Sequence, residues 1–219
     1  MKKKTWEYNT AEIMDARFSG GFQGAGGNSQ SLAFMMAAVS RLPDGFKVLT
    51  DFTWSKETNL IKGHKAVIAD YGCALGDGTA ALQAAYPLSQ VMGYDISPKA
   101  MEIAGKRWPH ITFEVGDILN PKSHDIVFAL HVLEHMQYPH EVAQGLLDTH
   151  KIVVVVVPFI TDDTFVTHEG AVNTKDWLAK LPEPDFVDHY NTVRADLEAD
   201  FGSNHICEGN ALYVWVNGS

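Results

Sequence analysis

The sequence predicts a doubly wound α/β fold with a mostly parallel sheet. From about residue 66 onward, apolar strand-like runs alternate with helix-like windows, which is typical of βαβ units. The longest apolar run, at 152–159, is rich in valine and suits a strand that is covered on both faces. The 219 residues, 46% of them apolar, fit one well-filled core better than two.

Five strands and three helices form the expected alternation. The strands are expected at 66–70, 91–95, 111–115, 124–129 and 152–157, and the helices at 77–85, 98–107 and 138–148. Ser97 and Pro98 place a capping hydroxyl directly before a proline at the first helical position. Farther along, a helix is expected at 174–180, and 211–216 as a final strand in an antiparallel pair with 186–190.

The first 65 residues contain no strand of comparable strength. They hold one expected helix, at 31–41, after the glycine-dense stretch GGFQGAGGNSQS. We therefore interpret residues 1–65 as an N-terminal cap or lid, and residues 66–219 as the ligand-binding domain of a single globular unit.

Composition disfavours several classes of partner. The formal net charge of −10 disfavours nucleic acid, whose binding depends on clustered lysine and arginine. No apolar run is long enough to cross a bilayer, so no membrane contact is expected. Two cysteines, Cys73 and Cys207, without a CxxC pair or a secretory segment indicate a reducing compartment, and we expect the cytoplasm. The sequence does not indicate an oligomeric state.

The segment VIADYGCALGDGT carries the main functional signal. It places Asp70 at the end of a buried strand, before a turn built from small residues. Such a turn lets the backbone approach a ligand at the carboxyl edge of the sheet. A dinucleotide fold needs G-x-G-x-x-G here, and the spacing of Gly72, Gly76 and Gly78 does not supply it. The alternative is a tight strand-to-helix turn with no ligand.

Two further acids are expected at the same edge. Asp95 follows Asp70 by 25 residues, about where a doubly wound fold presents a carboxylate to a ribose. Its alternative role is to cap the next helix, although Ser97 already supplies a cap. Asp117 ends the third strand, where it can accept from an adenine amino group or bond to its own backbone turn.

With these motifs, the chain resembles the class I S-adenosylmethionine-dependent methyltransferases over residues 66–160. DYGCALGDG is similar to their glycine-rich motif, YDIS to their ribose acid, GDI to their adenine contact and FALHVLEH to their segment after strand four. The resemblance implies a Rossmann-like seven-stranded sheet and S-adenosylmethionine as cofactor, with S-adenosylhomocysteine as product. It implies cofactor contacts from Asp70, Gly72, Cys73, Ala74, Gly76, Asp95, Ile96, Asp117, Ile118, Ala129 and His131.

One position departs from that pattern. Ala74 stands where glycine is usual after the cysteine, and we expect it to be tolerated with a negative φ. Cys73 itself is expected to be a small packing residue and not a nucleophile.

The outer segments suggest the acceptor. ARFSGGFQGAGGNSQSLAFM and HEGAVNTKDWLAKLPEPDF resemble parts of small-molecule or polysaccharide-associated methyltransferases. This resemblance implies a small polar acceptor such as a sugar, methylated on oxygen. Methylation of an amine, an NAD-dependent oxidoreductase or epimerase, and a non-catalytic cofactor-binding regulator are the alternatives.

A histidine-rich string follows the fourth strand. His131, Glu134 and His135 match H-x-x-E-H, the pattern of an inverted zinc-peptidase helix. Here the string follows a buried strand, so we predict no metal site and expect it to line the substrate entrance. For a hydroxyl acceptor, His131 is the expected base, then His135 or His168, with Glu134 orienting His131.

Overall fold

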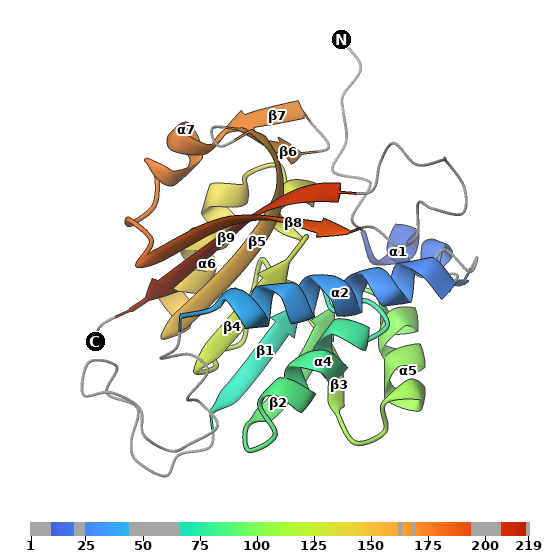
Figure 1. The fold of residues 1–219 in the computed structure, drawn as a ribbon. Coiled ribbons are helices and arrows are strands. Elements are labelled where there is room, and N and C mark those ends of the chain that lie inside the picture. Colours follow the sequence, from blue (N-terminus) through green and yellow to red (C-terminus); the bar gives the residue numbers. More distant parts are fainter. Residues whose placement is uncertain are drawn as a thin grey trace.

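Helices cover both faces of a central sheet (Figure 1). The computed structural model describes residues 10–19, 25–43, 66–161, 164–167, 170–193 and 207–217. The helices are α1 (Ala11–Ser19), α2 (Ala25–Arg41), α4 (Asp77–Ala85), α5 (Pro98–Arg107), α6 (Pro139–Thr149) and α7 (Thr174–Leu178), with the 3₁₀ helix η3 (Leu133–His135). The strands are β1 (Val67–Tyr71), β2 (Gln90–Asp95), β3 (Thr112–Val115), β4 (Ile126–Leu130), β5 (Ile152–Thr161), β6 (Thr164–Thr167), β7 (Gly170–Asn173), β8 (Phe186–Val193) and β9 (Cys207–Val216).

Seven of the strands form the expected mostly parallel sheet. Strands β3, β2, β1, β4 and β5 lie side by side and run parallel. Strand β9 then pairs antiparallel with β5, and β8 pairs antiparallel with β9. The predicted fold class is therefore confirmed, including the antiparallel C-terminal pair.

The end of β5 carries an extension that the sequence did not predict. Beyond Pro158, β5 continues to Thr161 and pairs antiparallel with β6, which in turn pairs with β7. This β6–β7 hairpin rises from the carboxyl end of β5 (Figure 1). Strand β6 also contacts η3.

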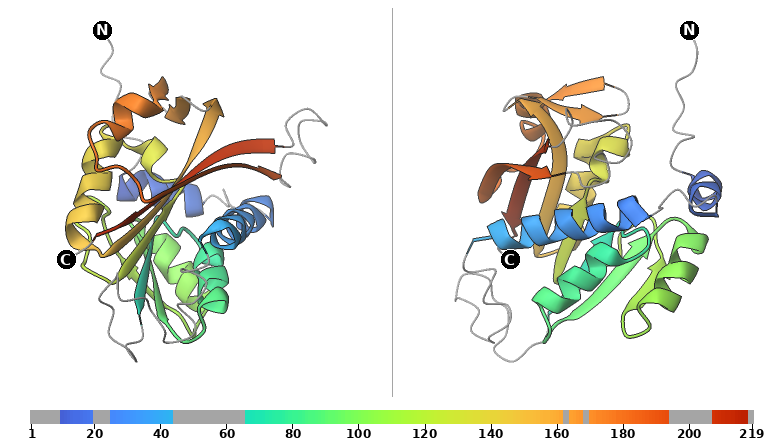
Figure 2. Two further views of the ribbon diagram at one scale, coloured as in Figure 1. Left: turned by 60° about the vertical axis from the view of Figure 1, so that its left-hand side comes forward. Right: turned by 45° about the vertical axis from the view of Figure 1, so that its right-hand side comes forward.

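The alternation of side chains along β5 explains the valine run. Val153, Val155 and Val157 join one core cluster with α6, while Val154 and Val156 join another with α2 and α4. Figure 2 shows α6 on one side of the sheet and α2 with α4 on the other. Because both faces are covered, every residue of the strand from 152 to 157 is buried, as predicted.

Helix α2 is longer and more integrated than predicted. It begins at residue 25, six residues before the expected start, so part of the glycine-dense stretch is helical. Its Met35 and Ala38, together with Leu42 directly after the helix, are buried in the same cluster as Ile68 of β1. Along its length it packs against α4, where the Ser31 carbonyl lies close to the Gly78 backbone.

Candidate functional site

The turn between β1 and α4 is held tightly against the end of β2. The backbone N–H groups of Gly72 and Cys73 both donate to the Tyr94 carbonyl oxygen, at 2.8 and 3.1 Å. Gly72 and Gly76 have φ of +75° and +81°, in the left-handed region that favours glycine. A Cβ added at residue 72 would lie 2.4 Å from Cγ2 of Val132. The turn therefore presents bare, exposed backbone beside the segment that follows β4.

Ala74 corrects one expectation. Its φ is +50°, not negative, so an alanine occupies the left-handed conformation in which glycine is usual. The backbone N–H of Ala74 donates to Oδ2 of Asp95 at 3.0 Å, and this bond fixes the orientation of the peptide. The methyl group costs about 1 kcal/mol of backbone strain, which the surrounding hydrogen bonds sustain.

Asp70 is a buried carboxyl group near the end of β1. The Thr79 hydroxyl of α4 donates to its Oδ2 at 2.7 Å. Burial, with a smaller contribution from the Asp95 carboxylate, raises the pKa of Asp70 to about 7, against the lowering effect of that hydrogen bond. A positively charged ligand at this edge would favour the ionised form.

Asp95 ends β2 and organises the next loop. Its Oδ1 accepts from the backbone N–H of Ser97 at 2.9 Å, while its Oδ2 accepts from Ala74. Burial raises the pKa of Asp95, backbone hydrogen bonds from Ser97, Ala74 and Ile96 oppose that shift, and the nearby Asp15 carboxylate adds to it. Helix α5 is capped by Ser97, whose hydroxyl accepts from the Ala100 N–H at 3.0 Å, as predicted.

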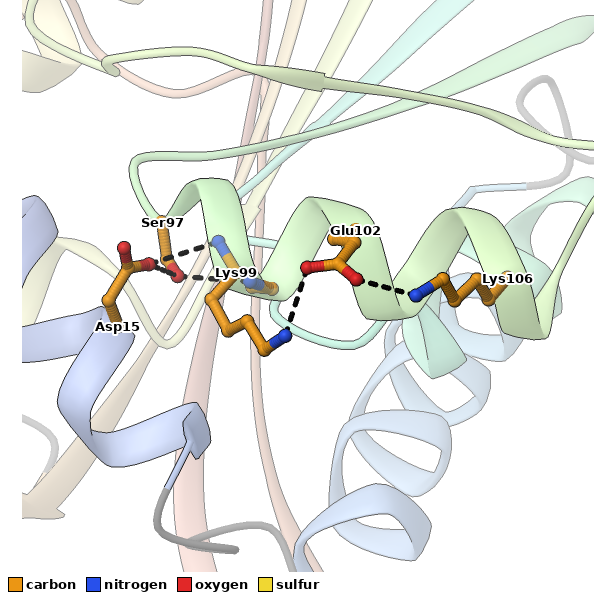
Figure 3. A network of polar contacts seen from close by, with 6 residues as sticks. Asp15, Ser97, Lys99, Glu102 and Lys106 are labelled. Atoms are coloured by element: carbon orange, nitrogen blue, oxygen red, sulfur yellow. Dashed lines mark hydrogen bonds and ion pairs between the residues drawn. The ribbon is translucent and has the colours of Figure 1, made fainter.

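Helix α1 docks on this loop through a contact that the sequence analysis missed. Asp15 accepts hydrogen bonds from the Ser97 hydroxyl and, at 3.0 Å, from the backbone N–H of Lys99 (Figure 3). On the exposed side of α5, Glu102 pairs with Lys99 and Lys106, and these two contacts lower its pKa to about 2. Asp15 thus adds a second carboxylate to the N-terminus of α5, where negative charge is favoured.

Cys73 and the glycines around it are packing positions. Cys73 is buried, and a Cβ at Gly93 of β2 would lie 2.9 Å from its Sγ. Burial raises the pKa of the Cys73 thiol well above its ordinary value, which keeps it protonated and unreactive. A Cβ at Gly76 would lie 2.6 Å from the Phe113 ring.

The third strand-end acid makes the turn contact that was its alternative role. Oδ1 of Asp117 accepts from the backbone N–H of Leu119 at 2.9 Å. Ile118 is buried in the core cluster that contains Tyr94, and Ala129 of β4 is fully buried in the same cluster. Ile96, between Asp95 and Ser97, is half-buried.

A cluster of polar and aromatic contacts surrounds His131, directly after β4. The ring of His131 stacks on Phe34 of α2, with centroids 4.0 Å apart, and its Nε2 lies 2.8 Å from Oδ1 of Asn210 on β9. On the other side, its Nδ1 lies 3.3 Å from Oε1 of Glu134. His131 has φ of +55°, which makes it, with Ala74, one of the two non-glycine residues with positive φ in the described parts of the chain.

The remaining candidates lie around the same carboxylate. Nε2 of His135 is 3.9 Å from Oε1 of Glu134, and its side chain is partly exposed. Oε2 of Glu134 is buried and has no hydrogen-bond partner among the described residues. His168 lies outside the described residues. No group of three metal-ligating side chains occurs within the described ranges, and η3 is a single 3₁₀ turn.

Comparison with solved structures supports the fold. A chain of the complex between the Haloferax volcanii Trm112 methyltransferase activator and a methyltransferase superposes with a TM-score of 0.65 over 94% of this chain and 98% of that one, at 15% identity. The plantazolicin methyltransferase BpumL, in complex with SAH, gives 0.56 over 95% and 91%, at 14% identity. At these identities the likeness concerns the fold.

Sequence comparison identifies the domain. Residues 69–151 match the family described as "Methyltransferase domain". The trans-aconitate 2-methyltransferase of Methylobacterium nodulans is 38% identical over 78 residues, which are 34% of this chain and 30% of that protein. The enzyme of the same name from Escherichia coli is 31% identical over 99 residues, or 42% and 38% of the two chains. The matched parts thus span less than half the length of these relatives.

The strand order, the glycine-rich turn after β1 and the acid at the end of β2 define a methyltransferase fold of the Rossmann-like type. Together with the family match, they show that residues 69–151 form a methyltransferase domain with the fold of the class I S-adenosylmethionine-dependent enzymes. S-adenosylmethionine is the cofactor of this class. In the parts of the chain that are described, no helix has the length and apolar character needed to span a membrane.

Proposed function

We propose that this protein transfers a methyl group from S-adenosylmethionine to an oxygen atom of a small polar acceptor, such as a sugar. The observation that carries the proposal is the pair of the half-buried His131 and the buried Glu134, which follows β4 beside the glycine-rich turn of a methyltransferase domain. An alcohol acceptor needs a basic group at this position, because its hydroxyl must lose a proton as the methyl group arrives. A cytoplasmic location and an acceptor other than nucleic acid belong to the same proposal.

The residues at the carboxyl edge of the sheet fit the cofactor. A Cβ at residue 72 would clash with Val132, so glycine at this position lets the turn pack closely against the segment that follows β4. Asp95 has a second lone pair on each oxygen beyond its backbone donor, enough to accept from two ribose hydroxyls. We assign the methionine part to Asp70, Gly72, Cys73, Ala74 and Gly76, the ribose to Asp95 and Ile96, the adenine to Asp117 and Ile118, and the closing contacts to Ala129 and His131.

In this reaction the protein positions the acceptor and supplies a group that takes up its proton. When bound, the cofactor supplies a methyl group on positively charged sulfur, so the leaving group is already activated. The protein must hold the acceptor oxygen in line and exclude water. His131 takes the hydroxyl proton, and the Glu134 carboxylate stabilises the resulting imidazolium across 3.3 Å. His135 is the second candidate base, because it faces the same carboxylate, and His168 is the third.

The relatives favour a second candidate acceptor. Both are trans-aconitate 2-methyltransferases, and a carboxylate acceptor of that kind needs no base because it is already ionised. Amine methylation, NAD-dependent chemistry and a regulatory role without turnover are the remaining alternatives.

Calorimetry tests the cofactor half of the proposal. We expect wild-type protein to bind S-adenosylmethionine and S-adenosylhomocysteine with micromolar affinity and not to bind NAD. An Asp95→Ala variant should lose most of this affinity, whereas Glu141→Gln, an exposed carboxylate of α6, should keep it. If the wild-type protein binds neither S-adenosylmethionine nor S-adenosylhomocysteine, the proposal is contradicted.

Turnover tests the acceptor half. Formation of S-adenosylhomocysteine is measured with sugars, amines and trans-aconitate. Methylation of a hydroxyl compound that is lost in His131→Gln supports the proposal. Methylation of trans-aconitate that survives in His131→Gln favours the carboxylate acceptor, and cofactor binding without turnover on any compound favours the regulatory role.

A further inference from the structure

Two stacked tyrosines contact the chain segment that joins β3 to β4, residues 116–125. Tyr71 of β1 and Tyr94 of β2 are neighbours in the sheet, each 1% exposed, and their ring centroids lie 4.8 Å apart. The β3–β4 segment carries Asp117 and Ile118, and Ile118 is buried in the same core cluster as both rings. A buried phenol hydroxyl is costly unless a partner completes its hydrogen bond. Both tyrosine hydroxyls find their partners in the β3–β4 segment.

The two hydroxyls hold the far end of the β3–β4 segment. The backbone N–H of Lys122 donates to the Tyr71 hydroxyl at 2.8 Å. The Tyr94 hydroxyl lies 2.8 Å from Nε2 of His124, whose Nδ1 contacts the Ser123 carbonyl oxygen. Because a carbonyl oxygen can only accept, Nδ1 of neutral His124 carries the hydrogen, and Nε2 accepts from the Tyr94 hydroxyl. Burial raises the pKa of Tyr94 to about 12, so this hydroxyl keeps its proton at neutral pH.

The ring and the backbone of Tyr94 hold the near end of the same segment. A Cβ added at Gly116, the residue before Asp117, would lie 2.8 Å from Cδ1 of Tyr94, so the segment begins in close contact with the ring. The Gly116 N–H donates to the Asp95 carbonyl oxygen at 3.0 Å. The Tyr94 carbonyl oxygen accepts from two backbone N–H groups of the glycine-rich turn. Tyr94 therefore contacts the turn after β1 and both ends of the β3–β4 segment, and it directly precedes the acid at the end of β2.

We propose that Tyr71 and Tyr94 are positioning residues that hold the β3–β4 segment where it meets the adenine of the cofactor. The inference rests on the proposed assignment of the adenine to Asp117 and Ile118. A segment that is fixed before the ligand arrives does not have to be ordered on binding, so the ligand binds more tightly. His124 stands at the amino end of β4, whereas the cofactor residues lie at the carboxyl ends of the strands. The tyrosines thus connect a contact at one edge of the sheet with the site at the other.

Removal of the hydroxyls tests the inference by calorimetry with S-adenosylhomocysteine. Each of Tyr71→Phe and Tyr94→Phe should weaken binding about threefold to tenfold, the size of one hydrogen bond, and the double variant should weaken it more than either. Tyr86→Phe is the matched control and should keep wild-type affinity. Tyr86 is equally buried, in the core cluster on the other face of the sheet, and its hydroxyl has no partner among the described residues. Wild-type affinity in the double variant would overturn the inference.

A second ligand separates positioning from a general loss of structure. S-inosylhomocysteine carries an oxygen in place of the adenine amino group, so the wild type should bind it more weakly. In Tyr94→Phe and in His124→Ala, which removes the acceptor at the far edge of the sheet, the ratio of the two affinities should fall towards one. A ratio that stays at the wild-type value while both affinities fall would show that the tyrosines are only structural, and would overturn the inference alone. Equal binding of the two ligands by the wild type would overturn the adenine assignment and the inference with it.

Discussion

Replacing Gly72 by alanine tests whether the turn after β1 has to remain bare. The added Cβ would lie 2.4 Å from Cγ2 of Val132, closer than van der Waals contact allows, at a residue with φ of +75°. Overpacking of this kind costs about 1–3 kcal/mol. The left-handed backbone adds about 1–2 kcal/mol for a residue with a side chain. We therefore expect Gly72→Ala to lower the free energy of unfolding by about 2–5 kcal/mol.

A second glycine supplies the matched control. Gly105 lies inside α5, and a Cβ there meets nothing within 4 Å. Gly105→Ala should stabilise the protein by about 0.5–1 kcal/mol, because alanine is the better helix former. Urea unfolding of the two variants beside the wild type measures both values. A Gly72→Ala variant as stable as Gly105→Ala would refute the close contact with Val132. A variant that is destabilised but still binds S-adenosylmethionine with wild-type affinity would refute the role of the turn as a ligand cradle.

Three further changes test the charged and strained positions. In the wild type, the raised pKa of Asp70 means that the folded state holds its proton more tightly than the unfolded state, so stability should fall as the pH rises from 3.8 to about 7. Asp70→Asn should remove this part of the pH dependence, which amounts to up to about 4 kcal/mol in the free energy of unfolding. Urea unfolding at several pH values measures it. An unchanged pH dependence in the variant would contradict the raised pKa of a buried carboxyl group. Ala74→Gly should raise the free energy of unfolding by about 1 kcal/mol, because glycine accepts φ of +50°, and a loss of stability would mean that the methyl group contributes packing. Asp15→Asn should lower the free energy of unfolding by about 1 kcal/mol, because the N-terminus of α5 loses a charged acceptor. Glu12→Gln, on the exposed side of α1, should not change the stability measured by thermal denaturation. Equal effects of the two substitutions would rule out the docking contact.

The elements that the sequence predicts correctly are those encoded by short, contiguous sequence patterns. Parallel strands covered on both faces read as short apolar runs, and the β5 valines are such a run. The start of α5 is also locally encoded, since Ser97 and Pro98 act within one helical turn. The cofactor edge follows from the same logic, because Asp70 and Asp95 end strands that lie next to one another.

The part that was missed depends on tertiary contacts. Helix α1 has the sequence AEIMDARFS, which has no strong amphipathic pattern, and its position on α5 depends on Asp15 meeting Ser97 across 82 residues. The β6–β7 hairpin consists of two four-residue strands, too short for an alternation to be convincing. Helix α2 begins inside a glycine-rich stretch, whose low helix propensity is overridden by packing against α4.

The proposed acceptor side of the site depends on contacts that no local sequence pattern encodes. His131 and Glu134 are visible in the sequence as a string, but Phe34 and Asn210, which hold the His131 ring, come from α2 and β9. No spacing rule connects residues 34, 131 and 210; only the insertion of β9 beside β5 and the packing of α2 across the sheet bring them together. The two halves of the site therefore differ in what a substitution should do. Changes in the turn and at Asp95 should lower cofactor affinity, whereas a change at Glu134, which has no assigned contact with the cofactor, should alter mainly the rate.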